Sequence, residues 1–190
     1  MLKKICAWLC FATLGLSPFA MAGGGSGTLL YIQPFEYSNP IALWNFSYRY
    51  WFEQGPIVEK LALEKFSQKF GEVSMCESNQ AGKMLVWLQP KMFYNPQLQL
   101  FYGKIVANVY TGMGKQLASY KGEAHAPGRL DIYPEQAIEK SYALALDRLI
   151  ANMQTDTQLA GIQHNGAAGE STPCSMVTLL PVPKVRATSF

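Results

Sequence analysis

The sequence is poor in charged residues and in histidine. Only 15% of its 190 residues are Asp, Glu, Lys or Arg, and it has two histidines, His125 and His164. Ordinary soluble domains carry about 25% charged residues. Since 49% of the residues are hydrophobic and 13% are aromatic, intrinsic disorder is excluded for most of the chain. Two histidines far apart in sequence do not have the spacing of metal ligands, so we expect no metal site.

The sequence also lacks the residue combinations of an active site. His125, with Asp131 nearby, is the one candidate base with an orienting acid, and no nucleophile stands on a recognisable turn beside it. The acidic residues fall mainly next to Lys or Arg on predicted helices, not as an isolated pair in apolar surroundings. We therefore expect no catalytic residue, no cofactor and no enzyme activity.

The first 22 residues have the pattern of a cleaved signal peptide. Lys3 and Lys4 precede an uncharged run from Ile5 to Leu16, and Ala20 and Ala22 provide the small-x-small cleavage motif. An uncleaved membrane anchor over the same stretch is the alternative. Cleavage after Ala22 predicts a periplasmic or secreted protein, peripheral to the outer membrane at most.

Removing this segment changes the charge and the cysteine content. Two of the 16 basic residues and none of the 13 acidic ones are lost, so 14 face 13 and the net charge is +1. A nearly neutral chain without a basic stripe lacks the charge that nucleic-acid binding requires. Cys76 and Cys174 are the cysteines that remain, and in an oxidising compartment such pairs form disulfides. We predict this disulfide, with two free thiols as the alternative.

The mature chain divides into a leader, a domain and a tail. Residues 23–27 are a glycine-rich leader, residues 28–154 form the domain, and residues 155–190 are predominantly small and polar. Such a tail buries too little apolar surface to offset its ordering entropy, so most of it is predicted to be disordered, with Met176–Val182 as the exception.

Hydrophobic periodicity predicts an α+β fold. Helices are expected from Pro56 to Gly71 and from Pro134 to about Met153, each with one apolar stripe. The expected strands are Thr28–Phe35, Met84–Tyr94 with Pro90 at an edge or bulge, Leu98–Val109 with a bulge at Gly103-Lys104, and Gln116–Ala124. The expected architecture is a two-layer sandwich, with an antiparallel or mixed sheet of about four or five strands and two helices on one face.

One segment is unusually aromatic. Five aromatic residues take every second position and a sixth interrupts the alternation; they are Trp44, Phe46, Tyr48, Tyr50 and Phe52, with Trp51 as the interruption. Period two places the first five on one face of an extended segment. Either this face packs on the core, or it is a binding surface for a partner or an apolar ligand.

The order of these features resembles a known family. The segment "SYRYWFEQGPIVEKLALEKFSQKFGEV" at 47–73 and the closing helix "EQAIEKSYALALDRLIANM" at 135–153 follow a first strand at Leu29–Phe35. This layout is similar to the periplasmic auxiliary components of ABC-type transport systems of the MCE lipid or solvent class. It also occurs in the amino-terminal domain of the Tol translocation protein and in outer-membrane assembly lipoproteins. The resemblance implies a non-enzymatic envelope role.

The chain departs from the transport family at the lipid anchor. Cys10 follows Ala7-Trp8-Leu9, which is not a lipobox. We therefore expect a non-catalytic periplasmic module, an auxiliary component of an ABC-type transport system that binds envelope proteins and has possible contacts with lipid or the outer-membrane surface. The alternatives are a structural or assembly subunit of an outer-membrane or secretion complex, and a binder of small apolar ligands that uses the aromatic segment and the strand Leu98–Tyr102.

Overall fold

The computed structural model describes residues 27–46, 48–77, 80, 82–159 and 173–179. The predicted signal peptide with its cleavage residues Ala20 and Ala22, and all of the glycine leader except Gly27, lie outside these residues. The elements in chain order are β1 (Thr28–Ile32), α1 (Pro34–Ser38), β2 (Ile41–Asn45), β3 (Tyr48–Phe52), α2 (Gln54–Phe70), β4 (Val73–Met75), β5 (Met84–Asn95), β6 (Leu100–Thr111), β7 (Gln116–Pro127), α3 (Pro134–Gln154) and the 3₁₀ helix η1 (Pro173–Leu179).

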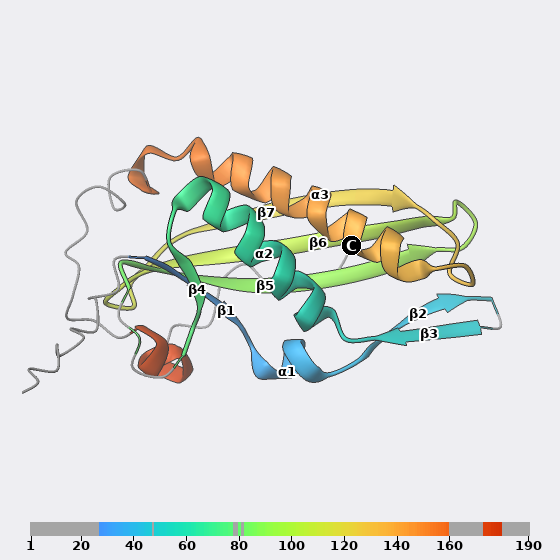
Figure 1. Cartoon of the computed structure of the whole chain (residues 1–190), viewed down its shortest axis with the longest axis horizontal. Coiled ribbons are helices and arrows are strands. Elements are labelled where there is room, and N and C mark those ends of the chain that lie inside the picture. Colours follow the sequence, from blue (N-terminus) through green and yellow to red (C-terminus); the bar gives the residue numbers. More distant parts are fainter. Residues whose placement is uncertain (1–26, 47, 78–79, 81, 160–172, 180–190) are drawn as a thin grey trace, which may run out of the picture.

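The main sheet is five-stranded and mixed, with strand order β4-β1-β5-β6-β7. Strand β1 is parallel to both β4 and β5, whereas β5, β6 and β7 are antiparallel to one another. Helices α2 and α3 lie together on one face of this sheet (Figure 1). The predicted α+β sandwich is therefore confirmed. A separate two-stranded sheet, formed by β2 and β3, is added to it.

Both long helices lie where their periodicity predicted them. Helix α2 ends at Phe70 because Gly71 takes a positive φ of 80°, which glycine adopts without steric cost. Helix α3 begins at Pro134, whose fixed φ suits the first turn. Its predicted apolar stripe is buried along its whole length: Ile138, Tyr142, Ala145, Leu146, Leu149 and Met153.

The predicted bulge at Gly103-Lys104 is wrong. Strands β5 and β6 pair without interruption, with Met92 opposite Gly103 and Lys91 opposite Lys104. The irregularity lies between Val109 and Tyr110, in the pairing with β7. Both faces of β6 are largely buried. Apolar residues at even positions therefore pack on one face of β6 and those at odd positions on the other, so the strand needs no bulge.

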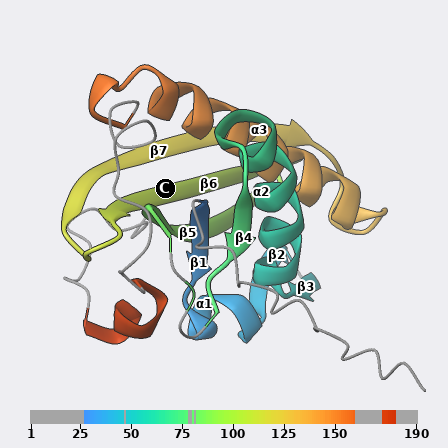
Figure 2. The ribbon, with the colours of Figure 1, turned by 60° about the vertical axis from the view of Figure 1, so that its left-hand side comes forward.

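A second, smaller apolar cluster lies on the sheet face away from the long helices. Leu29, Leu85, Trp87 and Tyr110 pack there with Val177 of η1. Figure 2 shows η1 on the side of the molecule opposite α3. Cys76 and Cys174 are bonded as a disulfide with a Cα–Cα distance of 5.5 Å, which attaches η1, a part of the predicted tail, to the domain.

Candidate binding surface and pocket

The aromatic segment is a hairpin, not one extended strand. Strands β2 and β3 pair antiparallel, and the chain reverses around Phe46, whose φ is 44°. The prediction that Trp44, Phe46, Tyr48, Tyr50 and Phe52 share one face is therefore wrong as a whole, since only Tyr48, Tyr50 and Phe52 do so. Trp44 lies opposite Arg49 and Ala42 opposite Trp51. Because directly opposed residues in an antiparallel pair point to the same side, Trp44 shares its face with Trp51, the residue that interrupts the alternation.

The inner face of the hairpin packs against the domain through Ile41, Leu43, Tyr50 and Phe52. Asn45 and Tyr48 belong to the same face near the turn, where Tyr48 is exposed. Leu43 and Phe52 are buried and belong to the main core with Met92 and Tyr94 of β5. The Tyr50 hydroxyl donates a hydrogen bond of 2.5 Å to Oε1 of Glu135 in α3. Burial, followed by this contact, raises the pKa of Tyr50 to about 12. The core interpretation of the aromatic segment thus holds for this face.

On the outer face, Trp44, Arg49 and Trp51 are turned to solvent, and Ala42 at its base is half-buried. Trp44 is 54% exposed and Trp51 57% exposed. The Arg49 guanidinium carbon lies 3.7 Å from the centre of the Trp44 ring, a cation–π geometry. Phe46 in the turn and Tyr48 beside it are also exposed. We call the exposed set Trp44, Phe46, Tyr48 and Trp51 the aromatic tip.

The aromatic tip lies at one end of the molecule. The hairpin extends toward the same end as the β5–β6 turn and the start of α3 (Figure 1). Leu98 in that turn and Tyr133 immediately before α3 are exposed as well. Leu98 is not part of a strand, because β6 begins at Leu100. The apolar side chains predicted for ligand binding at Leu98–Tyr102 are therefore split between a turn and a strand.

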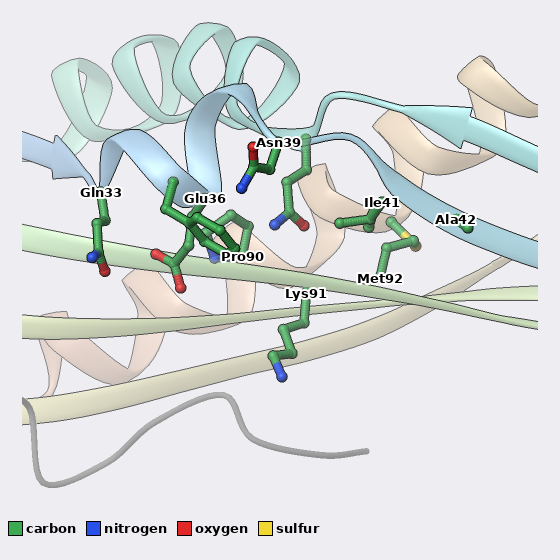
Figure 3. Close-up of a pocket in the computed structure, with 10 residues that line it drawn as sticks. Gln33, Glu36, Asn39, Ile41, Ala42, Pro90, Lys91 and Met92 are labelled. Atoms are coloured by element: carbon green, nitrogen blue, oxygen red, sulfur yellow. The ribbon is translucent and has the colours of Figure 1, made fainter.

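A pocket of about 440 Å³ opens at the base of the hairpin, where β1 leaves the sheet. The last residue of β1, Ile32, pairs with Leu88, while β5 continues to Asn95. Pro90 therefore lies on an edge of β5, as its missing N–H predicted. Figure 3 shows α1 and β2 above this edge. The apolar lining is Phe35, Ile41, Ala42, Pro90 and Met92, and the polar lining is Gln33, Glu36, Asn39, Gln54 and Lys91.

Glu36 is the unusual group of this pocket. Its Oε2 atom is buried and has no hydrogen-bond partner among the described residues. Burial raises the pKa of this carboxyl to about 7, against a smaller opposing effect of the Lys91 charge. The charge of Glu36 in turn adds to the burial that raises the pKa of Tyr31 on β1.

Little in the sequence indicated this pocket. Residues 28–35 were predicted to form one strand, and α1 was not expected. Pro34 stands in the first turn of α1, so the proline that favours a helix start was the available signal. The pocket itself depends on β1 being shorter than β5, which neither strand encodes alone.

The remaining chemical candidates do not come together. His125 is exposed, and its ring centre lies 5.6 Å from that of Tyr102. Asp131 instead accepts two hydrogen bonds from Arg129, at 3.1 and 2.7 Å. Within the described ranges there is no group of His, Cys, Asp or Glu that could hold a metal ion. In the same part of the chain, no helix is long and apolar enough to cross a membrane.

Comparison with known proteins yields a distant structural likeness. No protein-family model and no curated protein matches the chain. The crystal structure of protein XCC0632 from Xanthomonas campestris, described under the family model DUF330, is similar over 69% of this chain and 88% of that one. The sequence identity is 12% and the TM-score 0.42. A likeness at this level assigns neither a family nor a function to the chain.

Proposed function

We propose that this protein is a non-catalytic module of the bacterial periplasm that binds another envelope component through its aromatic tip. The observation that carries the proposal is the outer face of the hairpin, where Trp44 and Trp51 are each more than half exposed beside Arg49. Trp, Tyr and Arg are the residue types most enriched among the energetic centres of protein interfaces.

The position of the tip supports a docking role. Its backbone is held by the inner face, through buried Leu43 and Phe52 and through the hydrogen bond from Tyr50 to α3. The exposed rings therefore stand on a fixed support, so a partner would not have to order the hairpin backbone on binding. Because the hairpin already has a buried face, we expect folding not to require the exposed side chains of Trp44 and Trp51.

The periplasmic location is proposed from the signal-peptide pattern and the disulfide. The disulfide between Cys76 and Cys174 fits an oxidising compartment. The signal-peptide pattern predicts export to such a compartment. The more specific role, an auxiliary component of an ABC-type transport system, rests on the sequence resemblance. A subunit of an outer-membrane assembly or secretion complex is the competing role.

Crosslinking in intact cells tests the proposal. The triple variant Trp44→Ser/Tyr48→Ser/Trp51→Ser is expected to lose the crosslinked partner that the unchanged chain captures. Met113→Ser, at an exposed residue of the β6–β7 turn, is the matched control and should retain it. Mass spectrometry of the crosslinked species identifies the partner: a permease or MCE-type protein supports the transport role, and an assembly or secretion protein the competing one.

Two results would refute the docking role. The first is a triple variant that crosslinks as well as the unchanged chain. The second is a triple variant that is unfolded by circular dichroism, since the tip would then be part of the core.

A further inference from the structure

We infer that the pocket at the base of the hairpin is a binding site for an amphipathic amine, whose ammonium group is bound by Glu36 and whose apolar body lies against Ile41, Pro90 and Met92. This site is separate from the aromatic tip and does not depend on the proposed docking role.

The pocket has the size and composition of a small-molecule site. Its volume of about 440 Å³ falls within the roughly 300–1,000 Å³ of typical ligand pockets. Its walls come from α1, β2, the start of α2 and the edge of β5. One wall is fixed to the core, because the Tyr142 hydroxyl donates a hydrogen bond of 3.0 Å to Oε1 of buried Gln54. The pocket is therefore built into the fold.

The Glu36 carboxylate favours a cationic ligand. Glu36 lines the pocket, and its carboxylate can accept a charge-assisted hydrogen bond from a cationic ligand. An anionic ligand would instead be repelled by the ionised carboxylate. Gln33 and Asn39 also line the pocket, and side-chain amides of this kind can accept the other N–H groups of an ammonium through their carbonyl oxygens.

The charged groups of the protein near Glu36 leave its carboxylate available to a ligand. Tyr31 of β1 and Lys91 of β5 are titratable groups that interact electrostatically with Glu36. Glu36 forms no ion pair within the described residues. In Figure 3 the Lys91 side chain extends away from α1, which carries Glu36. Among the described residues, Lys91 therefore does not compete with the ammonium for Glu36 through an ion pair.

Isothermal titration calorimetry with three matched probes tests the site. The probes are 4-phenylbutylamine, 4-phenylbutanol and 4-phenylbutyrate, which share an apolar body and differ in the charge of the head group. We expect the amine to bind the purified protein most tightly and the acid most weakly. Glu36→Gln should weaken amine binding about tenfold or more, as expected for a lost charge-assisted hydrogen bond.

The controls separate the pocket from general charge effects. Glu64→Gln, at an exposed position of α2, should bind the amine as the unchanged chain does. Because the amine stays protonated below about pH 10, its affinity should rise between pH 6 and 8 as Glu36 ionises, and this rise should be absent in Glu36→Gln. Equal binding of amine and alcohol, undiminished binding to folded Glu36→Gln, or no binding of the amine would each overturn the inference.

Discussion

The two faces of the β2–β3 hairpin both carry aromatic residues and have opposite environments. The inner face places Leu43 and Phe52 in the main core, whereas the outer face leaves Trp44 and Trp51 more than half exposed. The aromatic residues of both faces come from one short stretch, Trp44 to Phe52. The difference shows that aromatic content does not distinguish a structural surface from a binding surface, since the direction of the chain assigns each ring to one or the other.

The largest difference between the faces should appear in folding stability. Leu43→Ala removes a buried side chain and leaves a cavity, so the free energy of unfolding should fall by about 2–5 kcal/mol. Trp51→Leu on the outer face should change it by about 0.5 kcal/mol or less. Urea denaturation followed by circular dichroism measures both. Equal losses would show that the outer face is also structural.

The Tyr50–Glu135 hydrogen bond gives a smaller, pH-dependent effect. Tyr50→Phe should lower the free energy of unfolding by about 1 kcal/mol at neutral pH. Because the pKa of Tyr50 is raised to about 12 in the folded state, its contribution is fully present below the unfolded pKa near 10. It is then lost as the pH rises toward 12.

Thermal unfolding between pH 9 and 12 checks this pH dependence. The unchanged chain should lose more stability than Tyr50→Phe over this range. The tyrosines with raised pKa values that both proteins keep, Tyr120 and Tyr142 among them, act equally in the two. Parallel Tm curves would argue against the anchoring of the hairpin to α3 by this bond.

The smallest effect is expected on the outer face itself. Arg49→Ala removes an exposed cation–π contact, which contributes roughly 0.5–1 kcal/mol. The free energy of unfolding should therefore fall by about 1 kcal/mol at most, and the fluorescence of Trp44 should change. Lys115→Ala, an exposed cation in the β6–β7 connection, is the control and should leave the fluorescence as it is. An unchanged Arg49→Ala spectrum would mean that the contact does not form in solution.

The elements predicted well are those whose signals are local. Helix α3 has a proline at its start and an apolar residue at every turn, so its span and its buried face follow from the sequence. The end of α2 follows from Gly71 in the same way. The pairing of Cys76 with Cys174 was predicted from composition, on the expectation that a signal peptide removes the other two cysteines.

The predictions that failed concern how segments meet. A period of two is shared by one long strand and by both strands of a hairpin, so the reversal at Phe46 could not be read from the alternation. The parity change at Gly103 was interpreted as a bulge, since the burial of both faces of β6 was not known. The Glu36 pocket exists because β1 ends at Ile32 while β5 runs on.

By itself, the sequence determined the α+β class, the two long helices with their buried stripes and the concentration of aromatic residues between Trp44 and Phe52. Propensity, periodicity and end signals act within a few residues of one another, and they suffice for these features. Only the tertiary structure decided which of those aromatics are core, where Trp44 and Trp51 form an exposed pair and where Glu36 meets a pocket. These depend on chain reversal and on relative strand length, which arise from contacts between segments far apart in the chain.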